Sequence, residues 1–210
     1  GIEKRISFNY NQYTCDDIGT QYFKFNATDP HNETDRLSIN FTLYADDIEI
    51  IYVYGNESEV NRSESTLLQV KVNDTDLNSL TGSNVNVTFW VTKDQIEWDS
   101  GYANKTEADS IASYYFTPTC TYNTGLQYWK AGTKDNSCYK DVNSTSLILY
   151  VYGWLRNNVT QPNGEVYESN SNVSIFGNVS DECGVKISNA NVNFNVTHDG
   201  FEDSCHPVEN

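Results

Sequence analysis

One stretch of this 210-residue chain occurs twice, and its repetition limits the fold more than any other feature. Residues 85–94 read Val-Asn-Val-Thr-Phe-Trp-Val-Thr-Lys-Asp, and residues 190–199, 105 positions later, read Ala-Asn-Val-Asn-Phe-Asn-Val-Thr-His-Asp. Apolar and polar residues alternate strictly in both copies, which predicts a half-buried β-strand. A repeat of about 100 residues has the size of one small β domain. The sequence therefore predicts an all-β protein made of tandem β-sandwiches.

The repeat divides the chain into three predicted segments. Residues 1–58 correspond to the C-terminal half of a domain, residues 59–165 to a complete domain, and residues 166–210 to the N-terminal half of another. In the first segment we expect strands at 5–10, 21–26 and 37–44. In the last segment, Val173 and Ile175 match Leu68 and Val70 of the complete domain.

Further matches join the first segment to the complete domain. Thr14-Cys15 followed by Gly19 to Lys24 is mirrored by Thr119-Cys120 followed by Gly125 to Lys130. The apolar positions of 147–151 are expected to mirror those of 41–45. Val91 precedes Cys120 by 29 residues, and the same count separates Val196 from Cys15 of a following copy. We therefore expect copies of the chain to join head to tail, each completing the other's half domain, either covalently within a longer polypeptide or by strand complementation.

Charge and hydropathy limit the class of partner. The formal net charge is −16, from 13 basic and 29 acidic residues, which argues against nucleic acid and against anionic membrane surfaces. The sequence has no apolar run of membrane-spanning length, so no membrane insertion is expected. It contains no Met and begins at Gly1, which suggests a processed product or an excerpt from a longer chain.

Asparagine is unusually often followed, two positions on, by Ser or Thr. The chain has 26 Asn, and chance would give about five such sequons, yet thirteen are present. Asn-x-Ser/Thr is the acceptor for N-glycosylation in secreted proteins. The expected sites are Asn26, Asn32, Asn40, Asn56, Asn61, Asn73, Asn86, Asn104, Asn143, Asn158, Asn172, Asn178 and Asn195. Those in predicted strands fall in the polar phase, so we expect an extracellular glycoprotein.

Five cysteines in a polar, secreted chain indicate disulfides, with one thiol left over or shared between chains. Cys120 and Cys138 bracket one strand and are favoured as a local pair. Cys183 is expected to pair with Cys15 of the next copy or with Cys205. A zinc site is not expected, because there is no Cys-x-x-Cys and the three His are scattered.

No set of residues predicts catalysis, so no enzyme activity is expected. The acidic turns at 16–17, 46–47 and 74–76 could hold Ca²⁺ with carboxylate oxygens. None follows an EF-hand pattern, and acidic turns are usually solvated, so we expect neither metal nor cofactor apart from N-linked glycans. Trp90 and Tyr44 fall on outward faces. We expect a neighbouring domain or an attached glycan to cover these two aromatic side chains, in preference to their forming a sugar-binding platform.

Three motifs together resemble the immunoglobulin-like repeats of large prokaryotic, especially archaeal, surface proteins and fibres. They are Val-Thr-Phe-x-Val-Thr-x-Asp at 87–94, Gly-x-Gln-Tyr-Trp at 125–129 and Asp-Glu-Cys-Gly at 181–184. The resemblance extends over the whole chain and implies immunoglobulin-like sandwiches in an extracellular setting. Antibody-type domains differ, because strands 85–92 and 21–26 carry no inward Cys to pair across the sheets.

The sequence thus favours a structural role, as a subunit or repeat of a glycosylated extracellular filament or stalk. The alternative is the ectodomain of an adhesin or of an S-layer-type cell-surface protein, in which the array only carries a binding face. Sequons spread over strands and loops of both repeats favour the coat of a filament over a bare binding surface.

Overall fold

The described part of the chain is all-β apart from one 3-10 turn. The computed structural model describes residues 5–28, 30–31, 34–198 and 201–205, which divide between two compact units, Gly1–Val151 and Tyr152–Asn210. The elements are η1 (Cys15–Asp17), β1 (Gly19–Thr28), β2 (Thr34–Leu43), β3 (Ile48–Tyr54), β4 (Ser58–Asn61), β5 (Thr66–Asp74), β6 (Ser79–Leu80), β7 (Asn86–Val91), β8 (Tyr102–Lys105), β9 (Ile111–Phe116), β10 (Gly125–Thr133), β11 (Leu147–Tyr152), β12 (Leu155–Gln161), β13 (Phe176–Asp181), β14 (Phe194–His198) and β15 (Phe201–Cys205).

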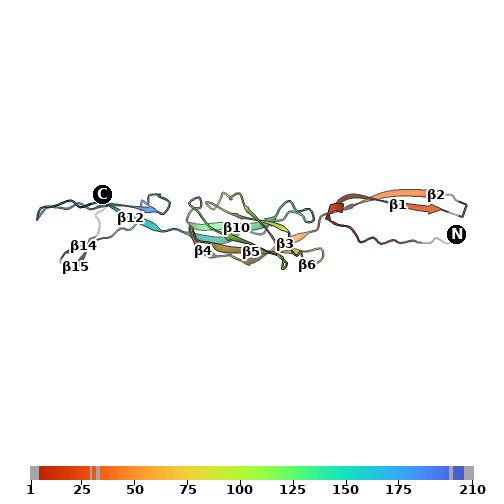
Figure 1. Ribbon diagram of the computed structural model, residues 1–210, viewed down its shortest axis with the longest axis horizontal. Coiled ribbons are helices and arrows are strands. Elements are labelled where there is room, and N and C mark those ends of the chain that lie inside the picture. Colours follow the sequence, from red (N-terminus) through yellow and green to blue (C-terminus); the bar gives the residue numbers. More distant parts are fainter. Residues whose placement is uncertain (1–4, 29, 32–33, 199–200, 206–210) are drawn as a thin grey trace. The chain divides into compact units, whose positions relative to one another are not determined.

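Strands β3 to β11 form a β-sandwich in unit 1. One sheet has the order β4-β11-β10-β7-β8, and the other consists of β3, β5, β6 and β9, with β9 paired to β5. The two sheets lie as separate layers, with β10 in one and β5 in the other (Figure 1). The ladders β10–β11, β10–β7, β7–β8, β3–β5, β5–β6 and β5–β9 are antiparallel.

The core of the sandwich follows from the alternating pattern of its strands. Successive side chains of a strand point to opposite faces. In β5 and β7 the alternate apolar side chains point into the core and are fully buried, as Leu68 and Phe89 illustrate. Trp129 of β10 is equally buried, and its indole Nε1 donates a hydrogen bond of 3.1 Å to the Gly55 carbonyl. Each such side chain stabilises the fold by about 1.5–3 kcal/mol relative to exposure.

The sandwich begins and ends earlier in the chain than the sequence suggested. β3 pairs with β5, with Ile48 opposite Asp74, so it is a strand of the sandwich rather than of the preceding segment. β12 pairs with β13 in unit 2. β3, which was expected in the first segment, therefore belongs to the sandwich, and β12, which was expected in the complete domain, pairs within unit 2.

Before the sandwich, β1 and β2 form a separate two-stranded hairpin. The strand expected at 5–10 is not formed, since residues 5–14 carry no strand assignment. Its counterpart in the sandwich, β9, is a strand held by a ladder to β5. The pattern at 5–10 therefore has strand character, but no neighbouring strand among the described residues completes it.

Unit 2 consists of two hairpins, β12–β13 and β14–β15. The turn after β13 is held by the Asp181 carboxylate, whose Oδ1 accepts hydrogen bonds from the backbone N–H groups of Cys183 (3.0 Å) and Val185 (2.8 Å). Most side chains of β12 and β13 are exposed, in contrast to the alternating burial of β5.

Candidate functional site

The N-terminal hairpin β1–β2 is a second copy of the pair β10–β11. Gly125 opens β10 opposite Val151, and Gly19 opens β1 opposite Leu43. Both glycines have positive φ, 100° and 120°, a conformation that side chains other than Gly rarely adopt. Two residues further on, Gln127 lies opposite Leu149 and Gln21 opposite Phe41.

This register corrects one expected correspondence. Leu147, Leu149 and Val151 match Ile39, Phe41 and Leu43, not residues 41–45. The difference is two residues. Because the side-chain period of a strand is two, such a shift leaves the inward and outward faces unchanged, which is why sequence alternation alone did not detect it.

The copied strands differ in burial. Trp129 of β10 is 0% exposed, whereas Phe23, its counterpart in β1, is 47% exposed. In the second strand the contrast is smaller: Leu149 of β11 is buried and its counterpart Phe41 is half-buried, while Leu147 is half-buried and its counterpart Ile39 is exposed. The hairpin thus presents to solvent the apolar face that the sandwich encloses.

Unit 2 repeats the other part of the sandwich. Ile48 opposite Asp74 in the β3–β5 pair corresponds to Leu155 opposite Asp181 in the β12–β13 pair. Both ladders carry an irregularity at the same place, between Tyr52 and Tyr54 in β3 and between Val159 and Gln161 in β12. A bulge is a specific local feature of a strand pair, so its recurrence identifies β12–β13 as the second copy of β3–β5.

β14 is the second copy of β7, as the sequence repeat predicted. In the sandwich, β8 and β10 occupy the two edges of β7. In unit 2, β15 occupies one edge of β14, and among the described residues no strand pairs with the other. Among the described residues, β1 likewise pairs only with β2, whereas β10 lies between β11 and β7. β1 and β14 therefore each have an unpaired edge, whereas β10 and β7 are paired on both sides.

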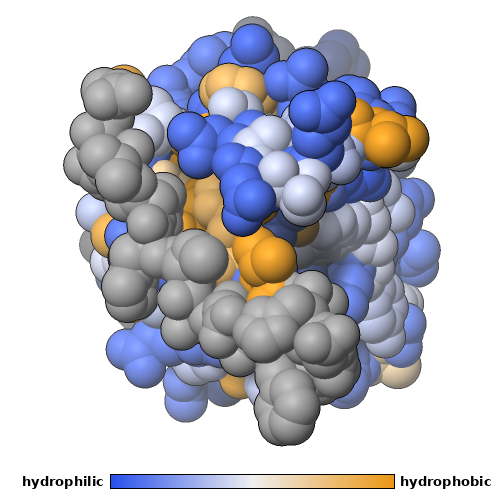
Figure 2. All heavy atoms as spheres, turned by 90° about the vertical axis from the view of Figure 1, so that its left-hand side faces the viewer, coloured by the Kyte–Doolittle hydropathy of each residue, from blue (hydrophilic) through white to orange (hydrophobic). Residues whose placement is uncertain are grey.

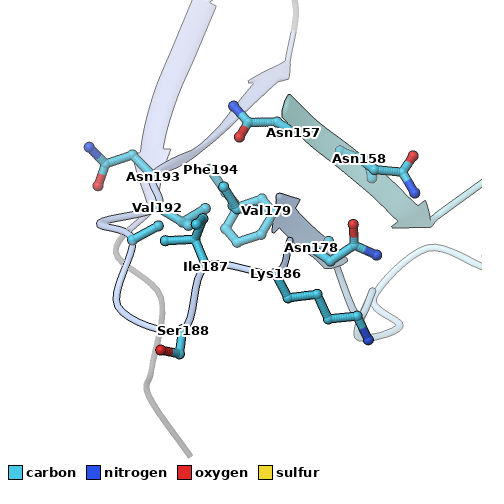
Figure 3. A pocket seen from close by; sticks show the side chains of 13 residues that line it. Asn157, Asn158, Asn178, Val179, Lys186, Ile187, Ser188, Val192, Asn193 and Phe194 are labelled. Atoms are coloured by element: carbon cyan, nitrogen blue, oxygen red, sulfur yellow. The ribbon is translucent and has the colours of Figure 1, made fainter. Parts of the chain in front are cut away.

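The N-terminal hairpin and unit 2 each have an apolar hollow. The hollow of the N-terminal hairpin has a volume of about 740 Å³, and its lining includes Phe8, Tyr10, Phe23, Phe25 and Phe41. The hollow of unit 2 has about 570 Å³ and is lined by Val179, Ile187, Val192 and Phe194 among others. In Figure 3, Phe194 and Ile187 point into this space, whereas Lys186 extends away from it. Figure 2 shows apolar surface open among hydrophilic side chains on one face of the molecule.

The sequence reasoning missed a buried polar centre at Gln127. Its Oε1 accepts hydrogen bonds from the Thr92 hydroxyl (2.9 Å) and from the Gln95 backbone N–H (3.0 Å). Its Nε2 donates to the Asn123 carbonyl (2.9 Å). The signal was present, because Gln127 has the same inward phase as Trp129 and Ala131.

Gln21 repeats one half of this arrangement. Its Nε2 donates to the Asp17 carbonyl at 2.5 Å, four residues upstream, as Gln127 does to Asn123. Within the part of the chain that the structure describes, the Gln21 Oε1 accepts no hydrogen bond. In the sandwich, the corresponding oxygen is bonded by groups that follow β7 directly.

The disulfides differ from the favoured pairing. Cys138 is bonded to Cys15, with 4.8 Å between the Cα atoms, and Cys120 and Cys183 are also disulfide-bonded. The expectation of a Cys120–Cys138 bridge is wrong, because β10 lies between the two residues and its nine residues span about 30 Å. Disulfides require Cα atoms within about 7 Å. Cys15 is likewise not left for Cys183 of another copy, and the side chain of Cys205 lies outside the described residues.

The Cys15–Cys138 bridge lies beside an acidic junction at one end of the sandwich. The Asp46 N–H donates to the Cys138 carbonyl (2.9 Å), and Lys140 forms an ion pair of 2.7 Å with Asp47. Burial, followed by the charges of Asp74, Asp76 and Asp47, raises the pKa of Asp46. A search of the described residues finds no group of three or more His, Cys, Asp or Glu that could hold a metal ion.

Nearly all the sequon asparagines among the described residues are exposed. Asn32 lies outside the described residues; of the other twelve, eleven are exposed and Asn73 is half-buried. Some amides are engaged, since the Nδ2 of Asn104 donates to the Ser113 carbonyl (2.8 Å) and that of Asn73 to Glu49 (3.1 Å). Asn86 lies on one sheet of the sandwich and Asn73 on the other, so both faces carry acceptors.

Trp90 lies on the outer face of β7, as its phase predicted, but it is partly covered by its own domain. The Lys130 ammonium lies 5.6 Å from the Trp90 ring and 4.5 Å from the Trp98 ring. Gly101 approaches so closely that a Cβ there would lie 2.6 Å from the Trp90 Nε1. A cation over aromatic faces is stabilising, and the cluster leaves two half-buried rings at the surface. Tyr44 is exposed.

Comparison with known proteins gives no family. No protein-family model matches the chain, and no curated protein matches it. Among solved structures, the chain is similar to one described as a tetra-tandem repeat in the extending region of a large adhesion protein. The identity is 14%, the TM-score is 0.40, and the match covers 89% of this chain and 55% of the other. A likeness of this size does not define a shared fold.

A search of the described residues for membrane spans finds no helix that is long and apolar enough to cross a bilayer.

Proposed function

We propose that this chain is a structural subunit or repeat of a heavily N-glycosylated extracellular filament or stalk, assembled head to tail through shared immunoglobulin-like domains. The single observation that carries the proposal is the duplication of the sandwich in two incomplete parts. One part is the hairpin β1–β2 and the other is unit 2, and each keeps an open strand edge and an exposed apolar face.

Two incomplete parts on one chain suit polymerisation better than a closed monomer. A solvent-exposed apolar face with an unpaired strand edge favours pairing with another chain. The two parts differ from each other, so a contact between them is heterologous. Heterologous contacts that do not close generate open fibres. The residues that carry the proposal are those lining the two hollows.

The extracellular setting rests on the disulfides and the sequons. Disulfides form and persist in oxidising compartments, and the Cys15–Cys138 bridge joins parts of the chain 123 residues apart. Thirteen sequons, against about five by chance, require the secretory route for their use. Glycans on both faces of the sandwich would keep a filament soluble and leave its two ends for assembly. Neither enzyme activity nor a metal cofactor is part of this proposal.

Electron microscopy of the purified protein tests the proposal. The expected result is fibres whose axial repeat contains two sandwiches for each 210-residue copy. Glycopeptide mass spectrometry of the same material should find glycans on most of the thirteen sequons. A population of unglycosylated monomers at high protein concentration would contradict both parts of the proposal.

A second candidate is the ectodomain of an adhesin or S-layer-type protein, and one observation favours it. The cluster of Trp90, Trp98 and Lys130 presents two half-buried indole rings beside a cation, a combination that suits stacking against a sugar. Binding to a glycan array that is lost in Trp98→Ala, with fibres absent, would favour this candidate over the filament.

A further inference from the structure

The sandwich contains a template for the contact between two copies. In it, β7 and β10 pair antiparallel, with Trp129 opposite Val91, Lys130 opposite Trp90 and Ala131 opposite Phe89. β14 is the copy of β7, and β1 is the copy of β10. The two strands that are neighbours in the complete domain thus recur as two strands that each have an unpaired edge.

Resting on the proposed function, we propose that β1 of one copy adds to the open edge of β14 of a second copy in the register of the β7–β10 pair. Sequence offsets of 106 for β1 and 105 for β14 fix that register. Phe23 then lies opposite Val196, Lys24 opposite Asn195, and Phe25 opposite Phe194. The occupant of each half domain is the complementary half of another copy of this chain.

The apolar contents of the two hollows fit this pairing. In the sandwich, the rings of Phe89 and Trp129 stack with centroids 6.4 Å apart, and both side chains are fully buried. Their counterparts are Phe194, which points into the hollow of unit 2 (Figure 3), and Phe23, which lines the hollow of the N-terminal hairpin. Joining the two strands therefore fills each hollow with the aromatic ring of the other half.

The segment before β1, residues 6–10, would also take part in the contact with the second copy. Its apolar residues Ile6, Phe8 and Tyr10 correspond, at the offset of β1, to Ala112, Tyr114 and Phe116 of β9. β9 pairs with β5, and the copy of β5 is β13. Phe8 is 86% exposed, and pairing with β13 of the second copy would cover it and complete the strand that is missing at 5–10.

The hydrogen bonds of Gln127 and of its counterpart Gln21 also favour this pairing. The Gln127 Oε1 is bonded from the segment that follows β7. The corresponding Gln21 Oε1 accepts no hydrogen bond in the described part of the chain, although the Nε2 bond to Asp17 is formed. In the proposed register, Gln21 lies near Thr197 in β14 of the second copy, which is the counterpart of Thr92 at the offset of 105. A carboxamide already oriented by Asp17 is therefore preorganised for that neighbour.

A second copy is favoured over closure of one chain on itself. The disulfide ties Cys15, just before β1, to Cys138, which follows the last residue of β10. β11 ends beside the first residue of β10, since Val151 pairs with Gly125. The two points at which the half domains are attached to the sandwich are thus separated by the length of β10, about 30 Å.

Cysteine cross-linking between two single variants tests both the partner and the register. We would mix Lys24→Cys with Asn195→Cys and oxidise, because both positions are exposed and lie opposite each other in the proposed ladder. Only contacts between different copies can then give a mixed disulfide. The matched control mixes Lys24→Cys with Asn193→Cys, which keeps the same strand face but is displaced by two residues. Each variant oxidised alone measures the background.

The expected result is at least tenfold more reducible dimer from the Lys24→Cys and Asn195→Cys mixture than from the control. Preferential cross-linking to Asn193→Cys would overturn the register. Fibres that form without either cross-link would overturn this contact but leave the proposed function standing. Absence of any assembly would overturn both, as would a double variant, Lys24→Cys with Asn195→Cys, that cross-links only within one chain.

Discussion

The pair β7–β10 and its separated copies β14 and β1 share one sequence pattern and differ in burial. Phe89, Val91 and Trp129 are fully enclosed in the sandwich, whereas Val196 and Phe23 are exposed by 41% and 47%. Alternation therefore determines which face of a strand can be buried, and the presence of a partner strand determines whether it is buried. A domain cut between β7 and β10 retains all its local signals and loses its core.

The largest expected contrast concerns the two equivalent phenylalanines. Phe89→Ala should lower the free energy of unfolding of unit 1 by about 3–5 kcal/mol, because it leaves a cavity in a closed core. Phe194→Ala should change it by less than about 0.5 kcal/mol, as for a substitution away from the sandwich. Urea unfolding followed by tryptophan fluorescence measures both. Equal losses would show that β14 shares a core with the sandwich of its own chain.

The disulfide gives the next largest effect. The double variant Cys15→Ser, Cys138→Ser should lower the free energy of unfolding by about 2–5 kcal/mol, because the bridge closes a long loop in the unfolded chain. Ser137→Ala is the matched control, since its hydroxyl lies 3.8 Å from the Cys138 sulfur but its loss leaves the bridge intact. Thermal and urea unfolding provide the measurement. An unchanged midpoint in the double variant would mean that the bridge does not constrain the unfolded state.

The third contrast is between Gln127 in the sandwich and its counterpart Gln21 in the N-terminal hairpin. Gln127→Leu removes the acceptor of the Thr92 hydroxyl and of the Gln95 N–H, and buried groups left without a partner cost about 1–3 kcal/mol. Gln21→Leu should leave the unfolding of unit 1 nearly unchanged but weaken fibre formation. Parallel urea titrations and light-scattering assays separate the two effects. A large loss of sandwich stability in Gln21→Leu would contradict the assignment of β1 to another copy's domain.

The smallest expected effect is that of pH at the acidic junction. The pKa of Asp46 is raised in the folded protein by burial and by neighbouring carboxylates, so the folded state binds a proton more readily than the unfolded state. Stability from this group is therefore present at low pH and is lost as pH rises through the folded pKa. Asp46→Asn should raise the thermal midpoint slightly at neutral pH and have no such effect below the ordinary Asp pKa. A lower midpoint at neutral pH would contradict this sign.

Much of the fold could be predicted from period-two patterns, and the exceptions have physical causes. The strands at 85–92 and 21–26 were correctly placed because their apolar phase is unbroken. The strand at 5–10 was expected from the same pattern, but a strand needs a ladder, and residues 5–14 have none in the described part of the chain. The boundary before β3 was missed because pairing with β5 depends on a partner that the local sequence does not specify.

In the candidate site, too, local sequence predicted some features, whereas others depend on tertiary structure. Exposure of the sequon asparagines followed from strand phase, whereas the role of Gln127 required knowing that its strand lies at the centre of a sheet. The Cys120–Cys138 pairing was wrong because spacing along the chain says little about which end of a sandwich a loop occupies. The link between Cys15 and Cys138 depends on the path of the ten strands, β1 to β10, between them.

That link also determines how the molecule responds to tension. Cys15 and Cys138 are separated by 123 in sequence, and the chain between them would extend to about 400 Å if unravelled. A pulling force that enters through β1 can pass from Gly19 to Cys15 and across the sulfur bridge to Cys138, bypassing β3 to β10. Strands β3 to β10 then carry no stretching load, whereas β11, which follows Cys138 and leads to β12, stays in the path of the force. Each subunit would therefore behave as a nearly inextensible link, with mechanical failure confined to the ladders of β11 and to those between neighbouring copies.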